Sequence, residues 1–371
     1  MAELLLKLKH PIRSFCIKND ILAVAQENIL LIYKYSTLTL IQTIKNHDKT
    51  ITSIDINEKT GNILTTSEDR TCLVLTPSNN TYTIAQVATR FLKSINFGKW
   101  NTNGNKFIIT SSDMAQLGVC YFDDSINWWI SKHITIPPTQ LHGGSLKKCS
   151  WDPENDILIT FADNLGNLLT VSTFLKHLDN KDSLKGSIYD TKFPFGKVLT
   201  TWYPNNNMIP VNDLAYVPNT TSQVLVLIQL DGSITLFDNL NGNTITKTYN
   251  QDFNKPFNVI KFVTDTEFIV AGYDNSALLY SVDNQSIKFI KTLNATAPVS
   301  AAVKNDEEEE EQFASGIQAL KMFKNMDSRG INQTVHADST NAHVMPITDL
   351  TVDSGNLITS GLDGKLISYS L

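Results

Sequence analysis

Cysteines, histidines and a run of acids are the residues of this chain whose chemistry could support a catalytic or metal site. The four cysteines, Cys16, Cys72, Cys120 and Cys149, lie far apart and form no CxxC pair. This spacing excludes a zinc knuckle and a dithiol redox motif, and it favours buried free thiols in a reducing compartment. The sequence also contains no P-loop, GxSxG or HExxH motif. We therefore predict that the protein is not an enzyme and holds no metal or cofactor.

The charged residues are unevenly distributed along the chain. Lysine and arginine number 31, aspartate and glutamate number 37, and the formal net charge is −6. Six of the acids form the run 306–311, and without them acids and bases balance. A neutral body argues against binding to nucleic acid, which requires a basic surface. No stretch approaches about 18 apolar residues, and the N-terminal apolar run is too short for a signal peptide. We expect a cytoplasmic protein without a membrane span.

Short strands that repeat along the chain are the elements that must position these residues. The clearest copies are Ile63–Leu75 and Phe268–Tyr280, each an apolar run, a tight turn and a second apolar run. Where the spacing is regular, successive copies end 42 or 43 residues apart. A period of about 40–45 residues with four strands per copy is typical of a β-propeller blade. The seven copies end at Tyr33, Leu75, Phe122, Val171, Phe237, Tyr280 and Tyr369.

Histidines upstream of the copies and aspartates in their turns indicate how a blade is held together. His47, His142 and His343 precede three of the copies. We predict an all-β fold, a seven-bladed β-propeller, and the pattern resembles the WD-repeat family. In that family the turn aspartate hydrogen-bonds the upstream histidine, so the resemblance implies a structural role rather than acid–base catalysis. The turn aspartates are Asp69, Asp113, Asp163, Asp231, Asp274 and Asp363.

The two ends of the chain and one long interval depart from the regular period. The seventh copy is followed by only two residues and lacks an outer strand, whereas residues 3–8 precede the first blade. We predict that residues 3–8 close the last blade, within a single propeller domain spanning residues 1–371. The interval between Tyr280 and Tyr369 shows no eighth copy. Residues 294–342 are therefore predicted to be an insertion between blades six and seven, with the acidic run and an amphipathic helix.

Trp128 and Trp129 are adjacent in the strand predicted to be the fourth of blade three. Successive side chains of a strand point to opposite faces, so each face receives one indole ring, which a partner or a neighbouring blade must cover. Both are therefore candidates for a partner interface. Residues 120–134 read Cys-Tyr-Phe, an acidic gap, Trp-Trp and Lys-His-Ile. This stretch resembles a motif of the WD-repeat subunit of the actin-related protein 2/3 complex, and Asn103–Phe107 and Phe193–Gly196 fit the same family.

The segment after the acidic run has a helical period. Phe313, Ile317, Leu320 and Phe323 share one face of a helix over residues 312–326, and the preceding acids suit the positive end of its dipole. The family resemblance implies that this insertion helix contacts actin through these four side chains. The alternative is that the helix packs back on its own propeller, although its flanks, 297–304 and the largely polar 327–341, favour a tethered segment.

The resemblance also implies a function. It predicts a non-catalytic structural subunit of the actin-related protein 2/3 complex, which supports actin filament nucleation and branching in the cytoplasm and actin cytoskeleton. The expected partners are the other subunits of that complex, the actin filament and nucleation-promoting factors.

Two other classes of propeller are alternatives. A WD-repeat scaffold or adaptor of a coat or ubiquitin-ligase complex would explain the blades, but not the motif at residues 120–134. A metal-dependent propeller lactonase would need a cluster of acidic, asparagine or histidine side chains around the central channel. The chain has seven histidines, and three of them stand at blade starts.

Overall fold

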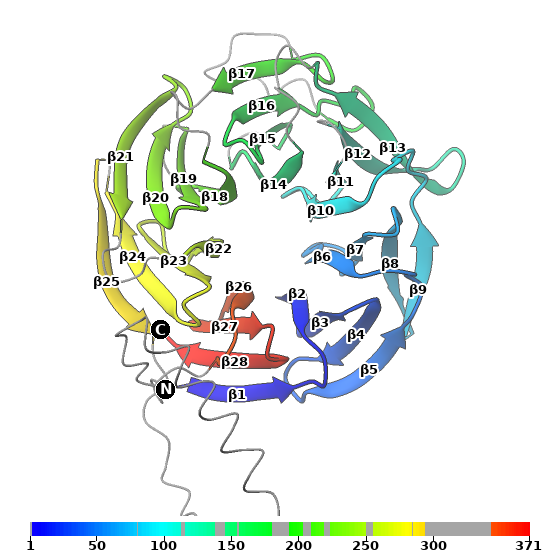
Figure 1. The fold of residues 1–371 in the computed structure, drawn as a ribbon. Helices are drawn as coiled ribbons and strands as arrows, with labels where there is room; N and C mark the ends of the chain where they lie inside the picture. The colour runs from blue at the N-terminus through cyan, green and yellow to red at the C-terminus, as the bar shows by residue number, and fades with distance from the viewer. Residues whose placement is uncertain are drawn as a thin grey trace, which may run out of the picture.

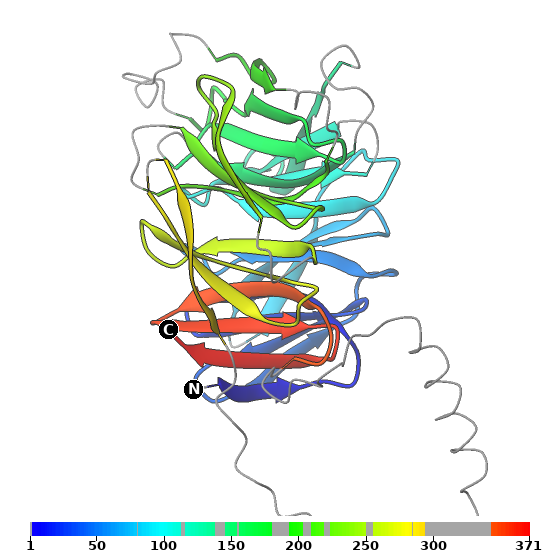
Figure 2. The same cartoon turned by 60° about the vertical axis from the view of Figure 1, so that its left-hand side comes forward.

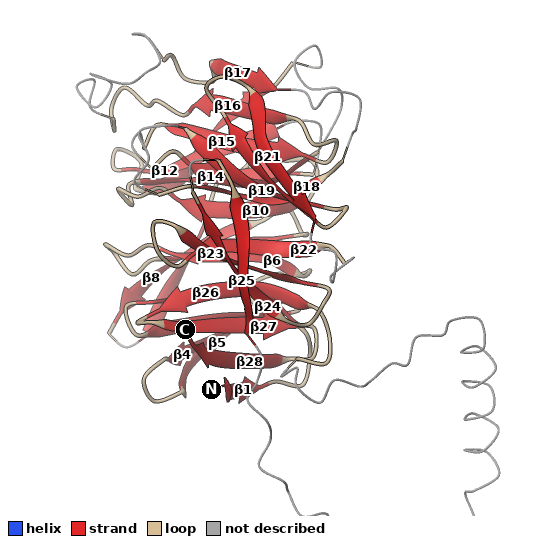
Figure 3. Cartoon of the chain, turned by 90° about the vertical axis from the view of Figure 1, so that its left-hand side faces the viewer, coloured by secondary structure: helices blue, strands red, loops and turns tan. Residues whose placement is uncertain are grey.

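The computed structural model describes residues 2–79, 81–112, 116–137, 145–153, 156–179, 193–202, 209–218, 223–249, 255–283, 285–293 and 343–371. These residues form strands and connecting loops without any helix (Figure 3). The strands make seven four-stranded antiparallel sheets, which stand as blades around a central axis (Figure 1). The prediction of a seven-bladed, all-β propeller is thus confirmed. The predicted insertion, 294–342, and its helix lie outside the described residues.

Each blade runs from an innermost strand at the axis to an outermost strand at the rim (Figure 1). The strands of blades one to three are β2 (Ile12–Lys18), β3 (Ile21–Gln26), β4 (Ile29–Lys34), β5 (Thr39–Ile44), β6 (Ile51–Ile56), β7 (Ile63–Ser67), β8 (Cys72–Ser78), β9 (Thr81–Gln86), β10 (Ile95–Trp100), β11 (Lys106–Ser111), β12 (Gln116–Asp123) and β13 (Trp128–Thr135). The strands of blades four to six are β14 (Leu146–Trp151), β15 (Leu158–Asp163), β16 (Leu168–Ser172), β17 (Val198–Trp202), β18 (Val211–Tyr216), β19 (Val224–Gln229), β20 (Ser233–Asp238), β21 (Asn243–Tyr249), β22 (Phe257–Phe262), β23 (Glu267–Gly272), β24 (Ala277–Val282) and β25 (Ile287–Leu293). Blade seven contains β26 (Ile347–Asp353), β27 (Asn356–Gly361), β28 (Lys365–Ser370) and β1 (Ala2–Lys7).

The middle strands are buried on both faces because a neighbouring blade packs on each side. Their sequences are therefore continuous apolar runs rather than alternating ones, as in the Val-Leu-Val-Leu-Ile stretch of β19. The outermost strands are more exposed, as in β5, where only Ile44 is buried. This gradient from axis to rim explains why the apolar run, turn and apolar run of each copy is the clearest signal in the sequence.

A separate apolar cluster fills each junction between neighbouring blades. Between blades two and three, for example, Leu64 and Val74 pack with Trp100, Phe107 and Trp129. Burial of apolar surface contributes roughly 25 cal/mol per Å², so each blade is stabilised by the two neighbours that cover it. The seven clusters together form a continuous ring of core around the axis.

The ring closes where the two ends of the chain meet. Strand β1 pairs antiparallel with β28, with Ala2 opposite Tyr369 and Leu4 opposite Ile367. Figure 2 shows β1 as the outermost strand of blade seven, beside the C-terminal strand. Residues 3–8, expected to close the last blade, lie in and directly after β1. The pairing covers the hydrogen-bonding edge of β28 that would otherwise face solvent.

The innermost strands share a distortion that aims side chains at the axis. A β-bulge follows the first residue of each of them, and a bulge locally re-aims the side chains that follow it. The third and fifth residues of all seven innermost strands line a central channel. Any chemistry at the axis therefore depends on these positions.

Candidate protein-interaction surfaces

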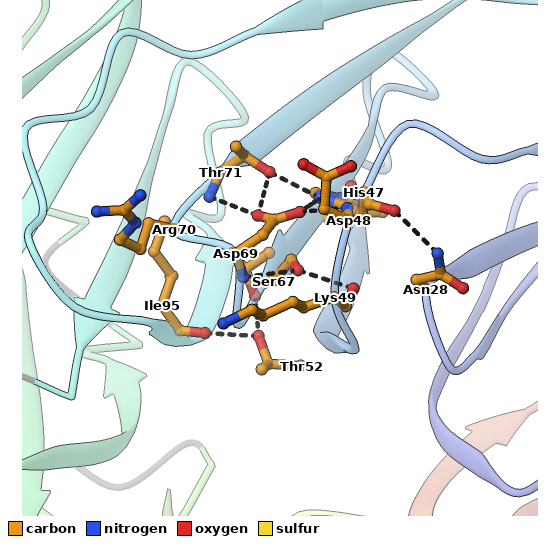
Figure 4. A network of polar contacts seen from close by, with 12 residues as sticks. Asn28, His47, Asp48, Lys49, Thr52, Ser67, Asp69, Arg70, Thr71 and Ile95 are labelled. Atoms are coloured by element: carbon orange, nitrogen blue, oxygen red, sulfur yellow. Dashed lines mark hydrogen bonds and ion pairs between the residues drawn. The ribbon is translucent and has the colours of Figure 1, made fainter.

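The turn of blade two is fixed by a buried hydrogen-bond network around His47 (Figure 4). Its Nδ1 lies 3.2 Å from Oδ2 of Asp69 and 2.8 Å from Oγ1 of Thr71, and its Nε2 lies 2.9 Å from Oγ1 of Thr65. Burial lowers the pKa of His47, although Asp69 opposes this. Burial alone would raise the pKa of Asp69, but hydrogen bonds from Thr71 and Asp48 outweigh it and lower that pKa. The pair is a structural clamp.

Blade seven repeats the same arrangement with His343. Its Nδ1 lies 3.1 Å from Oδ1 of Asp363, and its Nε2 lies 2.8 Å from Oγ1 of Thr359. The backbone amide of Val344 also donates to Asp363 at 3.0 Å. The histidine–aspartate contact that the resemblance implied is therefore present in blades two and seven. His142 and Asp113, predicted to act in the same way, lie outside the described residues.

Asp163 departs from the prediction, because it does not lie in the turn. It is the last residue of β15 and accepts hydrogen bonds from the amides of Leu165 and Asn167 and from the Asn167 side chain, at 2.9, 2.8 and 2.7 Å. The closing backbone bond from Asp163 to Asn167 is equivalent to that from Ser67 to Thr71 in blade two. In blade four the aspartate thus lies two positions earlier than Asp69 does in blade two, and it holds the turn through Leu165 and Asn167 instead of through an upstream histidine.

Blades five and six use lysines where blades two and seven use histidine. Asp231 accepts from Ser233 and lies 3.2 Å from Nζ of Lys247. Asp274 lies 3.5 Å from Nζ of Lys255. Every turn aspartate in the described part of the chain therefore has a structural partner. Within that part, no group of three or more His, Cys, Asp or Glu side chains could hold a metal ion.

The tandem tryptophans lie on opposite faces of β13. Trp129 is only 9% exposed, and its ring packs edge-on against Trp100 and Phe122 at centroid distances of 5.7 and 5.3 Å. Blades two and three therefore cover it. Trp128 is 50% exposed, and nearby Ile126 is 58% exposed. Of the two candidates for a partner interface, Trp128 is the one that offers surface to a partner.

A second exposed apolar group lies on the face of the ring that carries the turns between the second and third strands. We call this the turn face. Leu230 and Tyr273 stand in the turns of blades five and six, and Val344 and Met345 lead into blade seven. All four are exposed, Val344 to 72%. The sequence reasoning missed them because a single apolar residue beside a turn aspartate carries no periodic signal.

The predicted insertion starts and ends at the turn face. Leu293 ends β25 opposite Ala277, the residue that follows the turn of blade six, and His343 is held by the turn aspartate of blade seven. Phe313, Ile317, Leu320 and Phe323, the candidate actin-binding residues, lie outside the described residues. The structure thus locates the two ends of the insertion and leaves these four side chains as a sequence prediction.

The innermost strands enclose a central channel with a volume of ≈ 530 Å³. Two rings of seven residues line it. The third residues of the innermost strands are Ser14, Ser53, Phe97, Lys148, Asp213, Val259 and Asp349, and the fifth residues are Cys16, Asp55, Lys99, Ser150, Ala215, Lys261 and Thr351. Burial raises the pKa of the Cys16 thiol to about 12, so it is not a nucleophile at neutral pH.

Comparison with known proteins decides between the possible propeller families. The family described as WD domain, G-beta repeat matches residues 38–74. Actin-related protein 2/3 complex subunit 1 of Saccharomyces cerevisiae is 32% identical over 98% of this chain and 96% of its own length. The chain belongs to the actin-related protein 2/3 complex subunit 1 family. Subunit 1B of Arabidopsis thaliana is 26% identical over 88% of this chain and 84% of its own length. Subunit 1A-B of Xenopus laevis is 24% identical over 87% of this chain and 82% of its own length.

Membership of the subunit 1 family agrees with the prediction made from the motif at residues 120–134. Proteins of this family are WD-repeat structural subunits and not enzymes. Among the described residues, no helix has the length and apolar character that crossing a membrane requires. The candidate functional sites of this chain are therefore surfaces that could contact other proteins, above all Trp128 and the turn face.

Proposed function

We propose that this chain is a non-catalytic structural subunit of an actin-related protein 2/3 complex, supporting actin filament nucleation and branching. The observation that carries this proposal is its 32% identity to the yeast subunit over 98% of the chain. The similarity covers almost the whole chain and 96% of the yeast subunit, so it is not confined to one repeat. The proposed partners are the other subunits, the actin filament and nucleation-promoting factors, in the cytoplasm and actin cytoskeleton.

Exposed apolar surface supports an assembly role. Trp128, Ile126 and the four residues of the turn face are large side chains in contact with solvent, and clustered exposed apolar residues mark interaction sites. Tryptophan is also enriched among the residues that dominate binding energy at protein interfaces. We propose Trp128 as an anchor for a partner subunit, and Trp129 as the buried residue that fixes the strand carrying it.

Affinity purification tests the assembly role. The protein would be tagged, purified from its source cells at physiological salt, and its co-purifying proteins identified by mass spectrometry. Stoichiometric recovery of two actin-related proteins and further small subunits is the expected result. Recovery of coat or ubiquitin-ligase subunits would favour the alternative scaffold role instead, and a propeller that emerges alone would contradict the assembly role.

The insertion helix is proposed to contact actin through Phe313, Ile317, Leu320 and Phe323. Burial of four such side chains in a groove would contribute roughly 6–12 kcal/mol. Ordering a tethered segment costs about 2–5 kcal/mol or more, and association costs further free energy. The remaining free energy supports only weak binding to actin. Such a contact contributes when the rest of the complex is already bound, because the second binding event is then intramolecular. The attachment of both ends of the insertion at one face of the ring favours an outward-reaching segment.

A pair of matched double variants tests the helix. Phe313→Ala with Phe323→Ala removes the apolar face, whereas Gln318→Ala with Asn325→Ala alters the opposite side. The first pair is expected to reduce branch formation in an actin polymerisation assay without changing recovery of the complex. The second pair should behave like the wild type. Normal branching by the first pair, or equal loss by both, would argue against the contact.

A further inference from the structure

The central channel contains charged side chains that the assembly role does not use. Its two rings contain Lys99, Lys148 and Lys261 together with three aspartates, and Lys18 stands at the end of β2 beside them. Figure 1 shows the innermost strands meeting around this axis. The charge that the channel offers to a ligand depends on which of these side chains already form ion pairs.

Each of the three aspartates accepts a hydrogen bond from a residue of a neighbouring blade. Oδ2 of Asp55 accepts the amide of Trp100 at 2.8 Å, which ties blade two to blade three. Asp213 accepts the amide of Ile260 at 3.3 Å and so ties blade five to blade six. Asp349 accepts the hydroxyl of Ser14 at 2.9 Å and ties blade seven to blade one. Each carboxylate therefore acts as a staple between neighbouring blades.

Two of the four lysines are paired with these carboxylates. Nζ of Lys148 lies 3.1 Å from Asp213, and Nζ of Lys18 lies 3.6 Å from both Asp55 and Glu58. Among the described residues, no carboxylate lies within ion-pair distance of Lys99 or Lys261. Lys99 and Lys261 are thus the two channel lysines without an ion-pair contact, although Asp55 and Asp213 attract Lys99, and Lys261 attracts Asp349, at longer range.

Lys99 and Lys261 stand at the same level of the channel on opposite walls. Each is the fifth residue of its innermost strand, β10 in blade three and β22 in blade six, and these strands face one another across the axis (Figure 1). Burial and then the charge of Lys261 lower the pKa of Lys99, and Asp55 and Asp213 oppose that shift. Two like charges that face each other in a narrow channel repel, and an anion between them converts that repulsion into attraction.

We propose that the channel binds one phosphate-class anion between Lys99 and Lys261. Ser150 and Thr351 belong to the same ring of fifth residues, so hydroxyl donors are available beside the two ammonium groups. A volume of ≈ 530 Å³ holds an orthophosphate ion or the phosphate group of a small ester. The inference does not rest on the proposed function, since it concerns the axis and not the outer surfaces.

Titration calorimetry of the full-length chain with sodium orthophosphate tests the site. Ionic strength is held constant with sodium chloride, so that general screening does not register as binding. The expected result is saturable binding with one site per chain. A second titration uses glycerol 3-phosphate as a phosphate monoester. Tighter binding of orthophosphate identifies the free ion as the ligand, and tighter binding of the ester identifies the phosphate group of a metabolite.

Three variants make the test specific to the channel. Lys261→Met should weaken orthophosphate binding about tenfold or more, the effect of losing one charge-assisted hydrogen bond. Lys261→Arg should retain it. Lys291→Met is the matched control, because it removes the same charge from β25, the outermost strand of the same blade. Absence of saturable binding by the wild type, or equal weakening by Lys291→Met and Lys261→Met, would overturn the proposal. Lys99→Met provides a second channel variant with the same expectation as Lys261→Met.

Discussion

His47 is almost completely buried, yet both of its ring nitrogens have partners. Thr65 lies at one nitrogen, and Asp69 and Thr71 lie at the other. A buried polar group without a partner costs about 1–3 kcal/mol, so this histidine is tolerated only because the turn of blade two is built around it. The same logic holds for His343 in blade seven.

The first prediction concerns the loss of folding stability at low pH. Because the pKa of His47 is lowered below its ordinary value of 6.5, the unfolded chain takes up a proton more readily than the folded one. Stability should therefore fall as the pH drops below about 6.5. The pKa values of Asp69 and Asp363 are also lowered, from 3.8, so their contribution is present above about pH 4 and is lost as the pH falls further. Both effects act in the same direction.

Urea unfolding at pH 7.5 and pH 5.5 measures the histidine part of this effect. The wild type should lose free energy of unfolding between the two values, and His47→Gln should lose less, although it is less stable at both. An unchanged pH dependence in His47→Gln would contradict the prediction.

At the scale of elements, β1 determines whether the propeller is a ring or an open arc. Leu5 and Leu6 of β1 pack against the apolar cluster between blades seven and one, and Leu8 donates a backbone hydrogen bond to Gly364 at 2.8 Å. Without β1, the edge of β28 and part of this cluster would be exposed to water. The strand thus contributes both pairing and apolar burial.

The second prediction is that deletion of residues 1–9 destabilises the whole propeller. Leu5 and Leu6 are partly buried, so their loss costs less than the roughly 3–6 kcal/mol of two fully buried leucines, before the lost strand pairing is counted. Thermal unfolding followed by circular dichroism should show one transition at a clearly lower temperature. Leu4→Ser is the control, because Leu4 is exposed on the same strand and should change stability little. Unchanged melting of the deletion variant would rule out the closure as a source of stability.

A buried ion pair attaches the segment after β16 to blade three. Nζ of Lys106, which is fully buried, lies 2.8 and 2.7 Å from the two carboxylate oxygens of Asp179. Asp179 also accepts the amide of Leu175 at 2.7 Å. Burial lowers the pKa of Lys106, and Asp179 opposes that shift. The pair therefore links blade three to the segment that leaves blade four.

The third prediction is that the two partners of this pair are strongly coupled. Asp179→Ala should cost about 3–5 kcal/mol, because it leaves a buried ammonium group without a counter-charge. Lys106→Met combined with Asp179→Ala should cost less than Asp179→Ala alone. The free energies of unfolding of both single variants and the double variant give the coupling. Additive losses would show that the pair makes no specific contribution.

At the scale of the whole molecule, the adjacent residues Trp128 and Trp129 have different roles. Trp129 belongs to the junction between blades two and three, so it serves the ring. Trp128 faces solvent, so it is available to the assembly. The fourth prediction separates stability from partner binding through this pair.

Trp129→Ala should lower the free energy of unfolding by about 3–5 kcal/mol, as expected for a large aromatic side chain removed from a core. Trp128→Ala should change it by less than about 0.5 kcal/mol, yet reduce recovery of partner subunits in an affinity purification. Thermal unfolding and the purification are performed on the same preparations. Wild-type recovery of partners by the stable Trp128→Ala variant would remove Trp128 from the proposed interface.

Sequence by itself determined the period, the number of blades and the strands of each copy. These signals are local, because a strand, its turn and the next strand lie within about 15 residues of one another and the pattern recurs. The family resemblance rested on an equally local motif at residues 120–134. Asp163 escaped this reasoning because a shift of two residues along a turn that contains Asp and Asn leaves no trace in the composition.

Only the tertiary structure decided what lies together across the ring. It showed that blade two covers Trp129 whereas Trp128 stays exposed, that Lys106 meets Asp179, and that Lys99 faces Lys261 from the opposite side of the channel. The physical reason is distance along the chain. Closing the ring brings together residues that are separated by dozens to hundreds of positions, and no periodicity within one blade encodes which of them will meet.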